Sequence, residues 1–283
     1  MNMQTSYINI HVKINEEFYE PFYGFVSQLP IVGIEEGLDI IVVCFNAEDW
    51  NDDIHLQIEQ ILQLVAPDAK IQNIEEIANK NWNEEWEKTL QPIKIDDDIT
   101  ITPLASAEDI HAKHKITIVP KMSFGTGHHQ TTRLVCKLMK NLVSKSSYWI
   151  DAGTGSGVLA ILAAQLGADN VLAFDFDEWA YLNATENVVL NGLSEQINVI
   201  QSSVNDIQLP PANGILANMF KNILIESFPK FRDSIKPLDG DLIISGLLIY
   251  DNDEIIKAAE SNGFKVIDTL TEDEWIAIHL KTL

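Results

Sequence analysis

The sequence predicts an α/β protein in which a seven-stranded, mostly parallel sheet with helices on both faces follows a smaller α+β domain. Strand-like and helix-like apolar patterns alternate from Tyr148 to the end of the chain, as is typical of parallel sheets. A glycine-rich turn, D-A-G-T-G-S-G at 151–157, joins the first of these strands to an apolar helix. Residues 1–72 carry strand and helix patterns of their own, which indicates a separate domain.

The N-terminal segment is expected to form a small domain of ferredoxin-like type. Residues 7–12 alternate like a strand, and a helix is expected to begin near Pro21. Gly33 and Gly37 predict a turn before a second strand at 38–45. A second helix is expected over 54–65 and a short third strand at 70–74. Alternating strands and helices of this length are typical of that small fold.

A helical linker is expected over residues 73–92. Apolar residues recur on one face from Ile74 to Leu90, among acidic residues, and Pro92 ends the pattern. Trp82 and Trp86 lie one turn apart and are its anchor. Packing of one domain on the other is favoured for them over stacking on a substrate.

Two strand-like segments, 93–103 and 115–120, open the large domain, which is expected over 93–283. The segment between them carries His111 and His114, an H-x-x-H pair that could bind a metal. No further ligands of fitting spacing accompany the pair, so a surface loop is favoured and no metal is expected. After Pro120 a glycine- and threonine-rich turn precedes a helix over 134–142, and such turns can meet a charged ligand.

Repeating strand and helix units then follow to the end of the chain. The last two strands are separated by acidic turn residues and are expected to form an antiparallel hairpin. The expected strands are 148–150, 170–176, 197–202, 214–219, 241–247, 264–270 and 275–280, and the expected helices are 158–166, 178–191, 220–235 and 252–261.

The glycine turn has the character of a nucleotide site. Glycine tolerates positive φ and lets a ligand approach the backbone, and the N–H groups of the following helix point at that ligand. The dinucleotide fingerprint G-x-G-x-x-G would require glycine at Val158. The pattern present is D-x-G-x-G-x-G, with Asp151 ahead of it and Asp175 ending the next strand, where a carboxylate can bind a ribose. These two carboxylates disfavour a purely structural turn.

The net charge, the cysteine count and the N-terminal sequence indicate which partners and which cellular compartment to expect. The net charge is −23, which disfavours nucleic acid and anionic membranes and favours a basic partner. A solvated acidic surface explains the charge equally well. Only Cys44 and Cys136 are present, so a disulfide framework is not indicated. The N-terminus has no signal-peptide pattern, and a cytoplasmic location is expected.

Five motifs together resemble the PrmA family, methyltransferases of the large-subunit ribosomal protein L11. The segment F-G-T-G-H-H-Q-T-T at 124–132 is the most specific, and I-D-A-G-T-G-S-G-V-L-A-I at 150–161 carries the glycine turn. The remaining three are L-A-N-M at 216–219, N-W-N-E-E-W at 81–86 and I-S-G-L-L at 244–248. The resemblance covers most of residues 74–283. It implies a Rossmann-like methyltransferase domain.

The resemblance also implies an activity and its partners. Methyl groups would pass from S-adenosyl-L-methionine, leaving S-adenosyl-L-homocysteine, to lysine side chains or the N-terminal amine of L11 free of the ribosome. The small domain would recognise that protein. No nucleic acid, membrane or metal would take part. Asn218 is the candidate catalytic residue, because a neutral oxygen at a strand end can accept from an amine. The candidate cofactor residues are Thr132, Gly153, Asp175, Asn218, Asp151, Gly155, Phe124, Gly125 and Thr126.

Three departures from the family pattern occur: His128 replaces threonine, Gln130 replaces proline, and Met219-Phe220 replace Ile-Leu. Methyltransferases of adenine or glutamine amides typically show Asn-Pro-Pro-Tyr where this chain has Asn-Met-Phe-Lys. The sequence also leaves open the methylation of another protein or a small amine, a non-catalytic adenosine-binding regulator, and a nicotinamide oxidoreductase.

Overall fold

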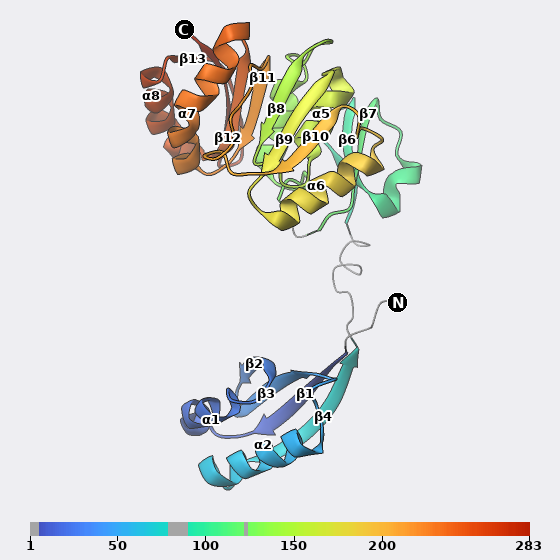
Figure 1. The fold of residues 1–283 in the computed structure, drawn as a ribbon, viewed down its shortest axis with the longest axis vertical. Helices are drawn as coiled ribbons and strands as arrows, with labels where there is room; N and C mark the ends of the chain where they lie inside the picture. Colours follow the sequence, from blue (N-terminus) through green and yellow to red (C-terminus); the bar gives the residue numbers. More distant parts are fainter. Residues whose placement is uncertain (1–5, 79–89, 122–123) are drawn as a thin grey trace. The chain divides into compact units, whose positions relative to one another are not determined.

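The computed structural model describes residues 6–78, 90–121 and 124–283. The chain divides into two compact units, Met1–Trp82 and Asn83–Leu283, which Figure 1 colours from blue to teal and from green to red. Each unit has buried clusters of its own. The cluster of the first unit draws on residues up to 71, and the two clusters of the second unit begin at residue 93.

The first unit is a four-stranded antiparallel sheet with two helices. Its order along the chain is β1 (Ser6–Lys13), α1 (Tyr19–Val26), β2 (Ile31–Gly37), β3 (Ile40–Asn46), α2 (Asp52–Val65) and β4 (Lys70–Ala78). The strands are ordered β2-β3-β1-β4, so the unit has the β-α-β-β-α-β pattern expected of a ferredoxin-like domain. Asn51 caps α2 by accepting from the N–H groups of Asp53 and Ile54, at 3.0 and 3.1 Å.

The turn predicted between Gly33 and Gly37 is wrong, because these residues belong to the edge strand β2. Gly33 pairs with Cys44 and Gly37 with Ile40. The chain reverses at Leu38–Asp39 instead, where Asp39 adopts a φ of 55°. Pairing with β3 outweighs the low strand propensity of glycine and glutamate in this segment. The missed strand completes the sheet.

The helix predicted from Ile74 is also wrong over its first residues. Strand β4 continues to Ala78, and Ile74 and Ile77 pair with Ile10 and Tyr7 of β1. The open edge of β1 offers this segment backbone partners that an isolated helix would lack, so tertiary pairing overrides the helical spacing. Residues 79–89 of the expected linker, with Trp82 and Trp86, lie outside the described residues.

The second unit contains the predicted seven-stranded sheet. Its strands are ordered β10-β9-β8-β11-β12-β14-β13, with β14 antiparallel to both neighbours and the other pairs parallel. Its elements are α4 (Gln130–Met139), β8 (Tyr148–Ala152), α5 (Val158–Leu166), β9 (Asn170–Asp175), α6 (Glu178–Leu190), β10 (Ile197–Gln201), β11 (Gly214–Asn218), α7 (Lys221–Ile235), β12 (Asp241–Leu248), α8 (Asn252–Ser261), β13 (Phe264–Glu272) and β14 (Trp275–Thr282).

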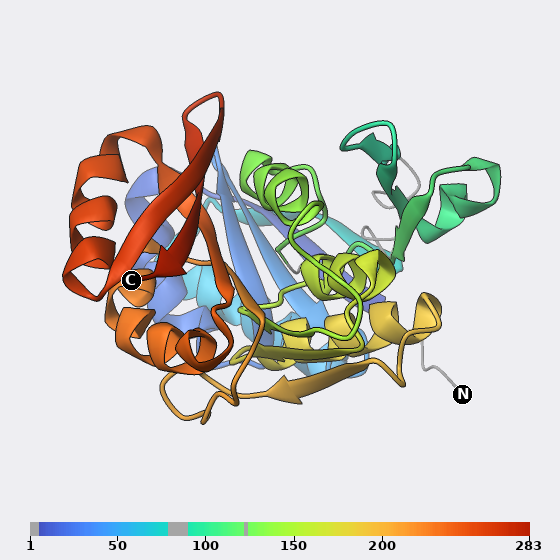
Figure 2. The same ribbon diagram turned by 90° about the horizontal axis from the view of Figure 1, so that it is seen from above.

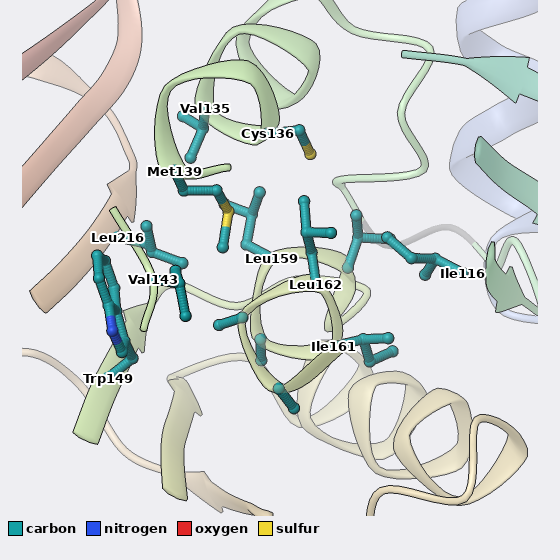
Figure 3. Packing of buried hydrophobic residues seen from close by; sticks show 14 of the residues in the cluster. Ile116, Val135, Cys136, Met139, Val143, Trp149, Leu159, Ile161, Leu162 and Leu216 are labelled. Atoms are coloured by element: carbon teal, nitrogen blue, oxygen red, sulfur yellow. The ribbon is translucent and has the colours of Figure 1, made fainter. Parts of the chain in front are cut away.

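Alternate residues of each central strand face opposite helical layers. Trp149 and Leu216 pack with α4 and α5, whereas Ile150 and Ile215 pack with α7 and α8. Figure 2 shows the green helices α4 and α5 and the orange-red helices α7 and α8 on opposite sides of the sheet. In Figure 3, Leu159 of α5 lies near Met139 of α4 within the first of these clusters. The helix that follows the glycine turn, α5, therefore shares one buried cluster with α4.

A small sheet of β5 (Ile93–Lys94), β6 (Ile99–Pro103) and β7 (His114–Ile118) packs beside α5 and α6. Two asparagines of α6 and a third at its C-cap, each four residues apart, bind the backbone of β7 and of Val119 just after it. Asn191 exchanges two hydrogen bonds with Thr117, Asn187 accepts from the Val119 N–H, and Asn183 donates to the Val119 carbonyl. Amide side chains thus supply the hydrogen bonds that a neighbouring strand would otherwise make.

The prediction that His111 and His114 both lie in a surface loop is wrong for His114. His114 begins β7 and is buried, while His111 precedes it and is exposed. Burial of the neighbouring isoleucines Ile116 and Ile118 draws His114 into the strand. Across the described residues, no group of three or more histidine, cysteine or acidic side chains could hold a metal ion. Across the same residues, no helix is long and apolar enough to span a membrane.

Candidate cofactor and substrate site

The carboxyl ends of three adjacent parallel strands bring the candidate residues together. Ala152 of β8 pairs with Phe174 of β9 on one side and with Ala217 of β11 on the other. Asp175 and Asn218 each lie one residue beyond these partners, so they flank the start of the glycine turn. Ligands of open α/β sheets bind at this edge.

Asp151 holds the glycine turn from beneath. Its side chain is fully buried, and Oδ2 accepts from the Thr154 hydroxyl at 2.6 Å and from the Ala160 N–H at 3.1 Å. Burial raises the pKa of this carboxyl to about 7, and the two hydrogen bonds oppose that rise. Asp151 thereby caps the first turn of α5.

Asp175 also binds the backbone of the glycine turn. One carboxylate oxygen accepts from the Gly155 N–H at 2.9 Å and the other from the Asp177 N–H at 3.1 Å. Only 8% of its surface is exposed. Each oxygen keeps a further lone pair, so the carboxylate can still accept from a hydroxyl of a ligand.

Hydrogen bonds from Ser156 connect the segment Phe124–Thr126 to the glycine turn. The Ser156 N–H donates to the Phe124 carbonyl and its hydroxyl donates to the Gly125 carbonyl, both at 2.9 Å. Thr126 shares a hydrogen bond with His128 Nδ1 at 3.2 Å. Two motifs that are separate in the sequence therefore form one surface.

Three candidate residues carry a buried oxygen that has no hydrogen-bond partner among the described residues. One is Oδ1 of Asp151, in β8 before the glycine turn. The other two are Oγ1 of Thr132, in the first turn of α4, and Oδ1 of Asn218, at the end of β11. The other end of the Asn218 amide, Nδ2, donates to the Thr131 hydroxyl at 3.2 Å. Buried acceptors are costly when they stay unpaired, so the oxygens of Thr132 and Asn218 indicate a polar ligand.

A pocket of about 250 Å³, which includes space open to solvent, joins the two motifs. Among the predicted residues, Asp151, Gly155, Asp175 and Thr126 are not part of its wall. The residues that line it are Phe124, Gly125, Thr132, Gly153, Thr154, Ser156, Val158, Leu159 and Asn218. None of these nine side chains is charged.

Sequence reasoning missed several residues that build this site. Thr154 and Ser156 occupy variable positions of the glycine motif, and Val158 and Leu159 follow it in α5, so their residue types signal no role. Asn187 was also missed, although it donates to the Ser156 carbonyl at 2.8 Å. A signal for it does exist in the sequence, in the repeat of asparagine every four residues along α6.

The residues that depart from the family motif do not line the pocket. Gln130 donates to Asp273 in the turn between β13 and β14 at 2.8 Å. The Met219 side chain lies against Gly153, where its Cγ is 2.9 Å from the position of an added Cβ. Phe220 is 76% exposed. His128 is exposed as well.

The residues present fit a cofactor with a ribose and a polar tail. Gly153, Gly155 and Gly157 adopt φ of 70°, 55° and 85°, a left-handed backbone conformation that favours glycine and forms the tight turn. The unpartnered oxygens of Thr132 and Asn218 offer polar contacts in the same wall. The first turn of α5 adds Val158 and Leu159 as apolar surface.

Comparison with known proteins gives one consistent family. The family model described as "Ribosomal protein L11 methyltransferase (PrmA)" matches residues 7–282. A ribosomal protein L11 methyltransferase of Chlorobaculum tepidum is 33% identical over 277 residues, covering 96% of this chain and 95% of its own length. One of Phocaeicola vulgatus is 34% identical over 223 residues, covering 78% and 79%.

A solved structure is similar as well. The crystal structure of a ribosomal protein L11 methylase from Lactobacillus delbrueckii subsp. bulgaricus superposes with a TM-score of 0.62 at 29% sequence identity. The match covers 68% of this chain and 99% of that one. The structural match therefore extends over about two thirds of the fold described above.

Proposed function

Because the chain belongs to the ribosomal protein L11 methyltransferase (PrmA) family, we propose that it transfers methyl groups from S-adenosyl-L-methionine to amino groups of L11. The unpartnered oxygen of Asn218 beside the glycine turn carries this proposal. It is a neutral acceptor at the edge of the sheet where the acceptor amine of a methyl transfer would have to lie.

The cofactor would be held by the backbone of Gly153, the hydroxyl of Thr132, the carboxylate of Asp175 and the surface of Phe124, Gly125 and Thr126. When bound, S-adenosyl-L-methionine supplies a methyl group activated by a sulfonium, and S-adenosyl-L-homocysteine leaves. Asp151 and Gly155 would act through the shape of the turn, since Asp151 is tied to Thr154 and Ala160. The protein itself contributes alignment and exclusion of water.

The amine must lose its proton before it can attack. A lysine has a pKa of about 10.4, so making it neutral at pH 7 costs about 4–5 kcal/mol at 1.36 kcal/mol per pKa unit. Burial in the uncharged pocket lowers this cost, because low polarity disfavours the ammonium form. Asn218 Oδ1 can accept from the remaining N–H groups without stabilising the charge, as a carboxylate would.

The acidic chain suits a basic protein partner. A net charge of −23 attracts a cationic ribosomal protein over a Debye length of about 10 Å and repels ribosomal RNA. The preferred substrate would therefore be L11 free of the ribosome, in the cytoplasm. We assign its recognition to the N-terminal unit, because the candidate cofactor residues lie beyond residue 120 and this unit has a core of its own.

The test is methyl transfer from labelled S-adenosyl-L-methionine to purified L11. The unmodified chain should label L11, and mass spectrometry should place the label on amino groups. Asp175→Ala should label L11 more weakly at a cofactor concentration that just saturates the unmodified protein. Labelling of another protein or a small amine in place of L11 would reassign the substrate. If the protein binds the cofactor but transfers no methyl group, it would be a non-catalytic adenosine-binding regulator.

A further inference from the structure

A series of short hydrogen bonds connects the candidate catalytic amide to a histidine. The Asn218 Nδ2 group donates to Thr131 Oγ1 at 3.2 Å, and Thr131 Oγ1 lies 2.9 Å from His129 Nδ1. The backbone N–H of Thr131 also donates to His129 Nδ1, at 3.3 Å. Thr131 is fully buried and is not part of the pocket wall. It therefore sits between the amide and the imidazole.

The donors and acceptors of this series fit in only one way. An amide nitrogen can only donate, so the Thr131 oxygen accepts from Asn218 and its hydroxyl hydrogen must go elsewhere. His129 Nδ1 accepts from a backbone N–H, so it is unprotonated, and the Thr131 hydroxyl shares its lone pair as a second, closer donor. The neutral ring therefore carries its proton on Nε2.

Several neighbours hold the imidazole in place. The centroid of its ring lies 4.4 Å from the ring centroid of Trp275, in an edge-to-face arrangement, and 5.2 Å from the ring centroid of Phe124. His129 is also the N-cap of α4. Burial and the nearby cation of Arg133 lower the pKa of His129, and Glu274 in the turn between β13 and β14 opposes them. These surroundings favour the neutral ring that the hydrogen bonds require.

We propose that His129 and Thr131 are positioning residues that fix the orientation of the Asn218 amide, so that its oxygen faces the acceptor amine. This inference rests on the proposed methyl transfer. A rotated amide would present its NH₂ group, which cannot accept from an amine. With the amide turned this way, Nδ2 is bound by Thr131 and Oδ1 is the unpartnered atom.

The first test removes one hydroxyl from the full-length chain. Thr131→Val should lower kcat for L11 by about tenfold, the effect of losing the partner of a buried polar group, with little change in affinity for S-adenosyl-L-methionine. Thr131→Ser keeps the hydroxyl and should restore most of the rate. Thr185→Val is the matched control, since the Thr185 hydroxyl binds only the Tyr181 carbonyl within α6, and it should leave kcat unchanged.

A double-mutant cycle shows whether Thr131 acts through Asn218. In the Asn218→Ala background, Thr131→Val should cost less than twofold, because there is no amide left to orient. An equal loss in both backgrounds would overturn the inference, whether or not Asn218 itself matters. If Asn218→Ala alone methylates L11 at the normal rate, the proposed role of Asn218 fails instead.

A spectroscopic readout is independent of activity. Nitrogen-15 NMR of the full-length protein at neutral pH should show His129 as the Nε2–H tautomer, and Thr131→Val should shift the side-chain amide signals of Asn218. His129→Asn keeps an acceptor atom near the position of Nδ1 and should retain more turnover than His129→Ala. A neutral ring carrying its proton on Nδ1 would contradict the inference even if L11 is methylated.

Discussion

The carbonyl oxygen of Phe124 lies 2.4 Å from the point where a Cβ on Gly155 would stand. A side chain at Gly155 would therefore separate the segment that precedes α4 from the glycine turn. The hydrogen bonds from Ser156 to Phe124 and Gly125 depend on the same approach. This contact explains why two motifs far apart in sequence act as one wall of the pocket.

We expect Gly155→Ala to weaken S-adenosyl-L-methionine binding at least tenfold, because the clash lies in backbone that cannot yield cheaply. Calorimetry on the folded variant measures the loss. Gly192→Ala is the matched control: Gly192 has a similar φ of +69° with nothing within 4 Å of an added Cβ. It should be destabilised by strain alone and bind the cofactor normally. Equal affinity in both variants would contradict the role of the contact.

Much of this architecture is predictable because patterns in the large domain are locally consistent. Residues 150–161 combine a buried strand, three glycines and an apolar helix, and each local preference agrees with the final fold. The two misses in the first unit share one physical cause. Strand β2 and the end of β4 form because neighbouring strands offer partners, and such long-range pairing leaves little trace in a single sequence.

The site shows the same division. Asp175, Gly153 and Asn218 can be found from their places at strand ends, since parallel strands bring those ends to one edge. Thr131 and Ser156 cannot, because a threonine or serine in a helix or loop has many common structural uses. Their roles depend on partners 87 and 31 residues away in the chain.

Asp175→Ala should reduce affinity for S-adenosyl-L-methionine by one to two orders of magnitude. The carboxylate is proposed to bind the ribose, and hydrogen bonds to charged groups contribute about 1.5–3 kcal/mol. The variant also loses the bond from the Gly155 N–H, so its melting temperature should fall. Asp175→Asn retains one acceptor for that N–H and separates the two effects. Unchanged affinity in a folded Asp175→Ala protein would remove Asp175 from the cofactor site.

Asn218→Ala should lower turnover much more than cofactor affinity, since the proposed contact is with the amine. We expect kcat for L11 to fall about tenfold or more, while the calorimetric Kd for S-adenosyl-L-methionine changes less than threefold. Parallel losses in both quantities would make Asn218 a cofactor contact only. A fall in melting temperature with normal turnover would make it a structural cap.

Asp151 should make stability depend on pH. Its pKa is raised to about 7 in the folded protein and lies near 3.9 in an unfolded chain. The folded state thus binds more protons between these values, so the free energy of unfolding falls as pH rises from about 4 to 7. Asp151→Asn removes this dependence. Relative to the unmodified protein, the variant should gain up to about 4 kcal/mol over that range, measured by urea unfolding at several pH values. A constant difference would show that Asp151 titrates normally.

The last prediction concerns the division of labour between the two units. A fragment beginning at residue 90 should fold and bind S-adenosyl-L-methionine, because both hydrophobic clusters of the second unit lie wholly within it. The same fragment should methylate L11 poorly if the first unit recognises the substrate, with the loss appearing chiefly in KM.

The dependence of methylation on ionic strength distinguishes recognition by the N-terminal unit from long-range electrostatic attraction. Methylation by the full chain should slow as ionic strength rises from low to about physiological, since screening over a Debye length of about 8–10 Å weakens long-range attraction of a basic protein. The apparent affinity for L11 should carry the change, and cofactor affinity should stay constant. If the fragment methylates intact L11 as fast as the full chain and with the same salt response, the N-terminal unit has no part in recognition. In that case the acidic surface of the second unit alone would guide L11 to Asn218.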